Sequence, residues 1–396
     1  MTGQTRALSE TLPPPVTESG VVGWLRKNLF STWYNALLTL VALYVIYLVL
    51  NGAWNFVTTA EWNVITANMR LFMVGPYPVE QTWRVQVSVG LFAFLVGASW
   101  RIWQGVARSA AILLGTIFLT AAVLPFAASE RAWLLTSFAS ILAGFTAAHF
   151  TRARRAWVWA WLLSLPVIGI LLYGVGDVLP RVQTDQWGGL LLTLTLAIVG
   201  IAASFPLGVL LAVGRQSTYP VIRAFCVGYI EIVRGVPLIT VLFMMQLMLP
   251  LFLPEGWTVE RAIRAMVGFT LFTAAYVAEI VRGGLQAIPR GQTEAARALG
   301  LNGVLMLLLI VLPQALRATI PAMVGQFISL FKDTSLVAIV GLLDLARIAN
   351  AAANQPEFLG RLTEVYVFIA AIYFVFASAM SYGSRRLERT LGVGER

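Results

Sequence analysis

The sequence predicts an all-α integral membrane protein with about ten transmembrane helices. Of its 396 residues, 59% are hydrophobic and 12% are charged, whereas a soluble domain is about 25% charged. Several uncharged stretches reach the roughly 20 apolar residues that cross a bilayer as a helix. The chain therefore lacks the polar surface that a soluble fold of this length requires.

The charge balance and the scarcity of reactive side chains exclude several functions. The net charge is +10, but basic residues of a membrane protein gather in cytoplasmic loops, and no basic run alternates with aromatic residues as a nucleic-acid surface would. One cysteine, Cys226, cannot form an internal disulfide, and one histidine, His149, cannot build a His-rich metal site. We therefore expect no nucleic acid, no bound metal and no nucleophilic hydrolysis.

The first half of the chain predicts a short tail followed by about five transmembrane helices. Residues 1–27 are mostly polar and are expected to form a cytoplasmic tail. Placing this tail inside puts most arginines of the connecting loops inside as well, as the positive-inside rule requires. An N-terminal extension then covers residues 28–180, with spans expected at residues 28–60, 84–101, 108–130, 131–152 and 155–177.

A long loop between the first two of these spans, residues 55–83, is expected outside the membrane. Its aromatic residues, Tyr77 among them, are expected at the membrane interface, where such side chains are enriched. Arg84 begins the second span and is expected to extend its guanidinium group to the same interface.

Residues 186–390 predict a second unit of five helices. An odd number of crossings from outside places the basic C-terminal residues inside, so both termini are predicted to be cytoplasmic. The apolar stretch 301–316 is not counted as a crossing, because arginines flank both ends and Pro313 would interrupt a spanning helix. We expect that stretch to lie along the inner face. The five spans are expected at residues 186–214, 223–250, 265–285, 319–343 and 365–383.

The cytoplasmic loop at residues 286–317 contains a pattern that favours a short helix. From Arg290 it reads R-G-Q-T-E-A-A-R-A-L-G-L. Its alanines favour helix, and Glu294 near the start suits the positive end of the helix dipole. Gly300 can adopt the left-handed conformation that ends a helix. Small exposed side chains permit close docking onto another protein, although an ordinary connecting helix has the same composition.

The spacing within this loop resembles the EAA signature of ABC importer permeases. Glu294-Ala295-Ala296 is followed after three residues by Gly300 and, after nine more, by Ile310-Val311-Leu312-Pro313. In that family the loop forms a coupling helix that fits a cleft on the ATPase subunit. The resemblance therefore implies contact with an ATPase through Glu294, Ala295, Ala296 and Gly300, with Ile310, Leu312 and Pro313 completing the signature.

Further segments are similar to the polar amino-acid uptake branch of these permeases. They lie at residues 229–238, 276–284 and 332–336, and the likeness covers about residues 186–390. The long N-terminal half is similar to the larger permease of general L-amino-acid or glutamate, glutamine and aspartate importers. The resemblance implies a type I importer core that carries L-amino acids across the bacterial inner membrane. Its implied partners are ABC ATPase subunits, a second, paralogous permease that forms a heterodimer with this chain, and a periplasmic amino-acid-binding protein.

The motor of such a transporter must lie in another subunit. A phosphate loop requires the pattern G-x-x-x-x-G-K-[ST], and neither of the two lysines, Lys27 and Lys332, follows a glycine. The chain is therefore expected to be a transport subunit without its own ATPase motif. It is expected to bind no cofactor, ATP being used by the partner.

Charged residues within the apolar regions are the remaining candidates for function. Glu231 with Arg234 and Glu279 with Arg282 share helix faces at i,i+3 spacing, as local ion pairs or as groups that position the coupling loop. Lys332 and Asp333 lie about fourteen residues beyond Arg317, or about 21 Å along a helix. Together with Thr334 and Ser335, they are expected to line the translocation path or its gate. The alternative is that Lys332 and Asp333 form a buried pair that holds helices together.

Two other classes of function are left as alternatives. A secondary transporter driven by an ion gradient would have inverted repeats and a coupling-ion site near the bilayer midplane, and no clear repeat is visible. A membrane-embedded enzyme or insertase would need a cluster of catalytic groups around a cavity. The single histidine and single cysteine argue against that class.

Overall fold

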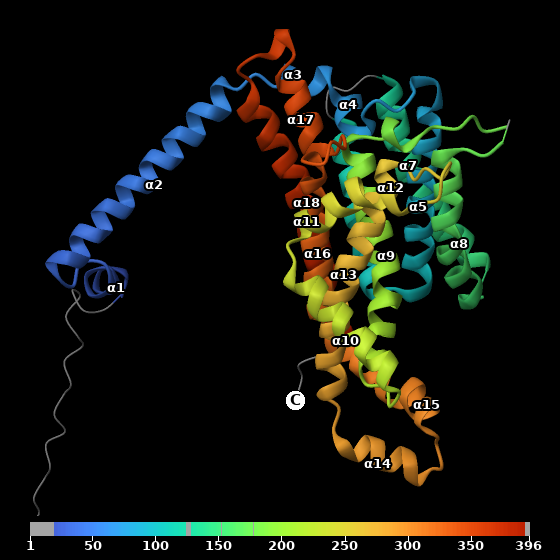
Figure 1. The fold of residues 1–396 in the computed structure, drawn as a ribbon. Coiled ribbons are helices and arrows are strands. Elements are labelled where there is room, and N and C mark those ends of the chain that lie inside the picture. The colour runs from blue at the N-terminus through green and yellow to red at the C-terminus, as the bar shows by residue number, and fades with distance from the viewer. Residues whose placement is uncertain (1–19, 124–127, 152, 177, 393–396) are drawn as a thin grey trace, which may run out of the picture. The chain divides into compact units, whose positions relative to one another are not determined.

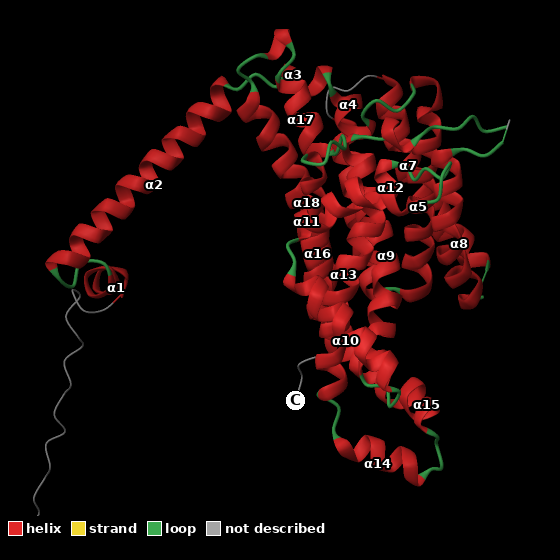
Figure 2. Ribbon diagram, viewed as in Figure 1, coloured by secondary structure: helices red, strands yellow, loops and turns green. Residues whose placement is uncertain are grey.

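The computed structural model describes residues 20–123, 128–151, 153–176 and 178–392, and these residues form helices and loops with no strand (Figures 1 and 2). Contacts divide the chain into two units, Met1–Glu61 and Trp62–Arg396. Nine helices among the described residues are long and apolar enough to cross a membrane, or ten if one bent pair counts as a span. The predicted all-α membrane class is confirmed.

The first unit contains the short helix α1 (Gly20–Asn28) and the long helix α2 (Trp33–Thr59). The Thr32 side chain caps α2 by accepting a hydrogen bond from the Asn35 backbone N–H. None of the described side chains of α2 is buried within its unit. A helix that is apolar on every side is suited to lipid, so α2 provides the first predicted span.

The second unit begins with three short segments, α3 (Asn63–Ala67), α4 (Met69–Val74) and the 3-10 turn η1 (Val79–Gln81). Four long helices follow, and they match the four further spans predicted for the N-terminal extension. They are α5 (Thr82–Trp103), α6 (Gly105–Val123), α7 (Ala128–Phe150) and α8 (Arg154–Tyr173). Arg152, the end of one predicted span, lies outside the described residues.

Glycines allow α5 and α7 to touch backbone to backbone. A Cβ atom at Gly97 would lie 1.9 Å from the Ile141 carbonyl oxygen, and one at Gly144 would lie 1.9 Å from the Phe94 carbonyl oxygen. Small residues at helix crossings are the usual device for close packing in lipid, where the hydrophobic effect does not hold helices together. These two helices therefore form a tight pair within the extension.

Two expectations for the external loop are wrong. Tyr77 is 0% exposed and donates a hydrogen bond of 2.8 Å to the Leu172 carbonyl oxygen. Arg84 is also fully buried, and its Nη1 donates to the Pro180 carbonyl oxygen at 2.9 Å. Neither side chain reaches an interface, because the protein encloses both and each donates to a backbone carbonyl oxygen. Tyr77 joins the segment before η1 to Leu172, near the end of the chain's first half, and Arg84 joins α5 to the loop that follows.

The second half supplies the remaining elements. A 3-10 turn, η2 (Thr184–Gln186), leads into α9 (Gly189–Arg215). Next come α10 (Pro220–Gly235), α11 (Leu238–Phe243), the π-helix η3 (Met244–Met248), α12 (Leu249–Phe252) and α13 (Arg261–Gln286). The last are α14 (Arg290–Ala298), α15 (Gly303–Met306), the π-helix η4 (Leu307–Val311), α16 (Leu312–Asp333), η5 (Thr334–Ala338), α17 (Leu345–Ala353), η6 (Pro356–Phe358) and α18 (Leu362–Leu391).

The predicted span at residues 223–250 is broken rather than straight. Its two parts, Pro220–Gly235 and Leu238–Phe252, meet at an angle of 106°. Pro237 lies at the break, where it offers no backbone N–H and disfavours helix in the residue before it.

The second part of this span is joined to α13 by a side chain. The amide of Gln246, in the π-helix η3, is buried and donates to the Arg261 carbonyl oxygen at 2.7 Å.

The stretch 301–316 is not a second crossing, in agreement with the prediction. It is, however, continuous with the spanning helix. Residues Gly303–Ala338 form one helix of 36 residues. Within it the Leu312 N–H bonds to the Leu307 carbonyl oxygen, as in a π-helix. This wider turn precedes Pro313, whose ring would clash with a regular helical turn. The expected interruption at Pro313 is therefore wrong, and the spanning helix ends at Ala338 rather than at residue 343.

One carboxylate joins the N-terminal extension to the second half. Glu260, just before α13, accepts hydrogen bonds from the Tyr173 hydroxyl at 2.8 Å and from the Thr184 N–H at 2.7 Å. Burial alone would raise the pKa of Glu260, but the hydrogen bonds from Thr184 and Tyr173 outweigh burial and lower that pKa. The extension and the second half therefore share polar contacts as well as an apolar core.

Candidate functional site

Helix α14 carries the sequence motif and stands out from the rest of its unit. Figure 1 shows α14 beyond the ends of the longer helices, joined to them at both ends. Glu294 and Ala295 are exposed, whereas Ala296 is 3% exposed. The helix therefore presents part of the motif to solvent and uses Ala296 to pack against the protein.

The end of α14 is a Schellman motif. Gly300 has a φ of +77°, the Gly300 N–H bonds to the Arg297 carbonyl oxygen at 2.9 Å, and the Leu301 N–H bonds to the Ala296 carbonyl oxygen at 3.2 Å. The left-handed stop predicted at Gly300 is in place. A Cβ atom at Gly300 would meet nothing within 4 Å. A substitution there would therefore act through backbone strain rather than through a clash.

Contacts beyond Gly300 tie α14 to the long helix. Asn302 caps α15 by accepting a hydrogen bond from the Leu305 N–H at 2.9 Å. The Gln314 side-chain amide donates to the Ile310 carbonyl oxygen at 2.8 Å and to the Gln292 side chain of α14 at 3.3 Å. Ile310 and Leu312 are half-buried and Pro313 is exposed. These residues join α14 to the helix rather than enlarge the exposed face of α14.

A close approach of backbones fixes the long helix against α13. A Cβ atom at Gly284 would lie 2.4 Å from Thr319 Cγ2 and 2.8 Å from the Ala315 carbonyl oxygen. Only glycine permits α13 and α16 to come this close at this level. The contact holds the long helix against α13 at the level of Gly284.

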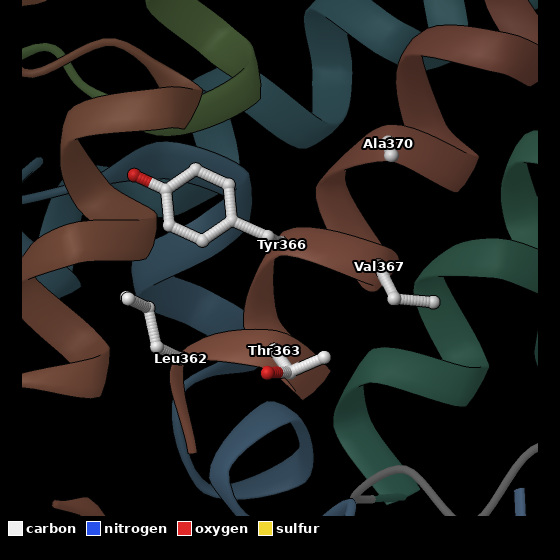
Figure 3. Close-up of a pocket in the computed structure, with 5 residues that line it drawn as sticks. All are labelled: Leu362, Thr363, Tyr366, Val367 and Ala370. Carbon is white, nitrogen blue, oxygen red and sulfur yellow. The ribbon is translucent and has the colours of Figure 1, made fainter. Parts of the chain in front are cut away.

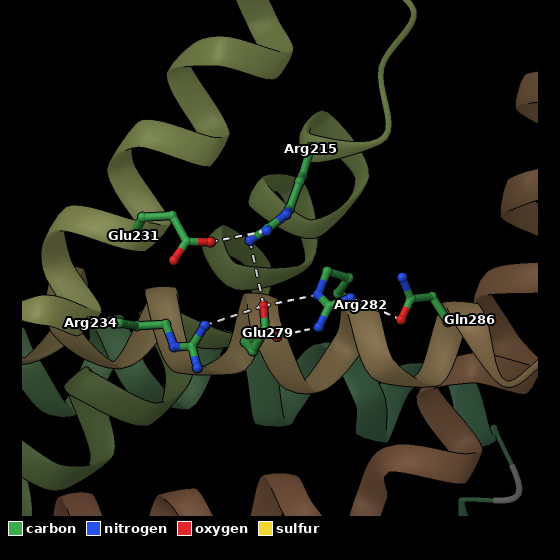
Figure 4. A network of polar contacts seen from close by, with 6 residues as sticks. All are labelled: Arg215, Glu231, Arg234, Glu279, Arg282 and Gln286. Atoms are coloured by element: carbon green, nitrogen blue, oxygen red, sulfur yellow. Dashed lines mark hydrogen bonds and ion pairs between the residues drawn. The ribbon is translucent and has the colours of Figure 1, made fainter.

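A cluster of charges surrounds Glu279 on the other side of α13 (Figure 4). Its carboxylate accepts hydrogen bonds from Arg282 Nε at 2.9 Å and from Arg282 Nη2. Arg215 at the end of α9 and Arg234 at the end of α10 approach the same carboxylate at 3.5 Å and 3.4 Å. One half-buried carboxylate, 23% exposed, therefore joins three helices through three arginines.

The predicted pairing within α10 differs from what the structure shows. Glu231 bonds to Arg215 at 2.9 Å, and Arg234 bonds to Glu279. Both side chains therefore contact other helices, whereas the i,i+3 contact of Glu279 with Arg282 is present. Arg215 was not among the functional residues expected from the sequence, although it is the charge that ends a long uncharged run.

The segment Lys332 to Ser335 lies far from this cluster, at the other end of the long helix. Lys332 is exposed and Asp333 is half-buried. The Thr334 hydroxyl donates to the Phe331 carbonyl oxygen at 2.7 Å, and the Ser335 hydroxyl donates to the Lys332 carbonyl oxygen at 2.9 Å. About fifteen helical residues separate this segment from the level of Gly284, or roughly 20–25 Å.

A hollow along α18 offers no charged group to a ligand. It has a volume of about 400 Å³ and lies along α18, lined by Leu362, Thr363, Tyr366, Val367 and Ala370 (Figure 3). A zwitterionic amino acid would need polar partners for both charged ends, so this groove suits hydrocarbon. In the part of the chain that the structure describes, no three His, Cys, Asp or Glu side chains are grouped to hold a metal.

Comparison with known proteins identifies the family. Residues 204–391 match the family described as binding-protein-dependent transport system inner membrane component. The inner membrane amino-acid ABC transporter permease protein YhdY of Escherichia coli (strain K12) is 39% identical, over 98% of this chain and 99% of that protein. The chain belongs to the amino-acid ABC transporter permeases. It is a multi-pass protein of the inner membrane.

A second permease with a similar sequence supports this membership, and one solved structure is also similar. The glutamate/glutamine/aspartate/asparagine transport system permease protein BztC of Rhodobacter capsulatus is 38% identical, over 96% of this chain and 95% of that protein. A solved amino acid ABC transporter is 32% identical, covers 50% of this chain and 90% of its own, and superposes with a TM-score of 0.45. Nothing in these similarities favours the ion-gradient alternative.

The charge cluster of this permease predicts a specific stability loss. Replacing Glu279→Gln should leave Arg234 and Arg282 without a carboxylate partner and Arg215 with Glu231 alone, which we expect to lower the free energy of unfolding by about 1–3 kcal/mol. Thermal unfolding of the detergent-solubilised protein measures this change. Glu255→Gln, in an exposed loop, is the matched control and should change stability little. Equal unfolding temperatures for the two variants would show that the cluster does not hold the helices together.

Proposed function

We propose that this chain is the permease subunit of an ATP-driven importer of L-amino acids, and that α14 is its coupling helix. The observation that carries the proposal is the placement of α14. It is exposed, bears the EAA residues, and is continuous through a fixed turn with the 36-residue helix. A force applied to α14 would therefore reach a helix that spans the membrane. The amino-acid transporters named above support L-amino acids as cargo.

The motor is proposed to be a separate ABC ATPase that receives α14 in a cleft. Exposed Glu294 and Ala295 would face that cleft, and Gly300 would fix the direction in which α14 leaves it. This chain has no phosphate loop of the P-loop type, so we propose that it hydrolyses no ATP and binds no cofactor. The family description names a binding-protein-dependent system, which supports a periplasmic binding protein as the source of the amino acid.

The permease is proposed to act as a dimer with a second, paralogous permease, with both termini cytoplasmic. The positive-inside rule supports this orientation. Arg26 and Lys27 end α1 just before α2, and Arg385, Arg386 and Arg389 lie at the end of α18. Within the second unit, α14 lies at the end of the helices where α18 finishes (Figure 1). An ATPase bound to α14 would then be in the cytoplasm, where ATP is available.

The segment Lys332 to Ser335 is proposed to line the translocation path or its gate. An exposed lysine near the end of an otherwise apolar spanning helix is costly in lipid and usually faces water or protein. Among the residues that the structure describes, Lys332 has no ion pair within this chain. A position facing the second permease across a polar path would solvate it.

Substitution at Gly300 tests the role of α14. Gly300→Val forces a β-branched residue into the left-handed region, at a cost of about 1–2 kcal/mol, and should weaken ATPase binding by about tenfold. Gly300→Asn tolerates this conformation better and should retain more of the binding. The affinity of the purified ATPase for the permease pair measures both effects.

The control for this test is Gly383→Val. Gly383 lies in α18 with helical backbone, and a Cβ atom there would also meet nothing within 4 Å. The Gly383→Val variant should leave ATPase binding unchanged. Unaltered ATPase binding and uptake in Gly300→Val would contradict the coupling role of α14.

Variants at the far end of the long helix test the path. Lys332→Met and Asp333→Asn should reduce amino-acid uptake by more than about tenfold while assembly and ATPase binding persist, because a polar lining would be lost without affecting α14. Uptake into vesicles containing the complete transporter measures the first effect. Lys27→Met, which replaces the only other lysine, is the control. Normal uptake in both path variants would remove these residues from the path.

A further inference from the structure

A small polar hollow lies at the end of α18, and its lining shares no residue with the charge cluster around Glu279. Its lining consists of Tyr382, Arg385, Arg386 and Arg389, and its volume is about 80 Å³. Pockets for drug-sized ligands are about 300–1,000 Å³. This hollow therefore has room for a single small group, and its lining selects for negative charge.

The three arginines have no carboxylate partner among the residues that the structure describes. Arg385 Nη1 donates to the Ser381 hydroxyl at 2.8 Å, and Arg386 Nη1 donates to the Tyr382 hydroxyl at 3.5 Å. The nearby carboxylate of Glu388 accepts a hydrogen bond from the Ser384 hydroxyl at 2.7 Å instead. Guanidinium groups bind phosphate oxygens in a bidentate manner, so an anion of this kind would relieve their mutual repulsion.

Helix α6 adds positive potential at the same place. It packs against α18, and its first residue, Gly105, lies next to Thr390, because a Cβ atom there would be 3.9 Å from the Thr390 hydroxyl. The N-terminus of a helix carries a partial positive charge. Arg108, in the first turn of α6, is exposed. The arginines that line the hollow and the positive end of α6 therefore both lie at the last turns of α18.

The surface of α18 that leads to the hollow is apolar. Phe374 is 72% exposed, Val375 is 41% exposed and Tyr382 is 44% exposed. Phe374 and Arg385 are eleven residues apart, which places them on nearly the same face of the helix. An apolar face, then a tyrosine, then arginines is the order expected from the hydrocarbon region to the headgroup region of a membrane. A soluble anion would not require the apolar part of this surface.

We infer that this hollow binds the phosphate of an anionic phospholipid, whose acyl chains lie along the exposed face of α18. Arg385, Arg386 and Arg389 hold the phosphate oxygens, and Tyr382 lies at the level of the headgroup. The site holds the junction of α6 and α18, and so connects the N-terminal extension to the last helix of the permease core. This inference is independent of the role assigned to α14.

Retention of lipid by the full chain in its complex tests the inference. The complex is placed in nanodiscs of phosphatidylcholine and phosphatidylglycerol in equal parts and extracted into mild detergent, and native mass spectrometry counts the lipids that stay bound. We expect the wild type to retain phosphatidylglycerol selectively, and Arg385→Gln with Arg389→Gln to reduce that selectivity by about tenfold. The control is Arg154→Gln with Arg155→Gln, which removes the same charge from exposed positions at the start of α8 and should retain the selectivity.

Two further arms separate the lipid from other anions. Inorganic phosphate in excess should not displace phosphatidylglycerol from the wild type, a measurement that needs no variant. Arg385→Lys with Arg389→Lys keeps the charge, and should retain part of the selectivity even if the glutamine variant folds poorly. Three results would each overturn the inference. They are displacement of the lipid by inorganic phosphate, equal lipid loss in the pocket and control variants, and loss of ATPase binding with lipid selectivity unchanged.

Discussion

The passage of one helix through Pro313 is the constraint on which the rest of the structure depends. A regular α-helix would be kinked or broken there, and the connection that follows α14 would then no longer be continuous with the spanning helix. The π-turn at Leu307–Val311 widens the helix just before the proline, so Gly303–Ala338 continues as one element. The turn that follows α14 and the Lys332 segment therefore lie at opposite ends of one continuous helix.

Within the second half of the chain, α13 holds the long helix in place. Gly284 brings α13 into backbone contact with Ala315 and Thr319 on the long helix. Close by, Glu279 gathers arginines from α9, α10 and α13 itself. Displacement of the long helix would therefore be passed to α13 and to the helices that share its carboxylate. By sequence spacing these charges form two separate local pairs, but in the structure they form one cluster because their helices lie side by side.

Hydropathy and charge predicted much of the fold because lipid imposes a simple requirement on each span. The uncharged runs correspond to α2, α5 to α9, α13 and α18, and Gly300 has the left-handed backbone expected of a helix stop. Tyr77 and Arg84 were misplaced, because local sequence does not show that a distant loop will cover them. Pro313 was misjudged because a π-turn depends on backbone hydrogen bonding that hydropathy does not contain. Arg215 was missed because its partners, Glu231 and Glu279, lie on other helices.

The most direct test of the account is whether α14 and the far end of α16 move as one body. Spin labels at Arg290→Cys and Ser335→Cys, with Cys226→Ala removing the native thiol, report this distance by pulsed electron paramagnetic resonance in the complete transporter. A second pair, Arg290→Cys with Ala110→Cys on α6, reports movement of α14 against the extension. If α14 and the long helix move together, ATP changes the second distance and leaves the first unchanged. A nucleotide-dependent change in the first distance, with the second constant, would contradict that joint movement.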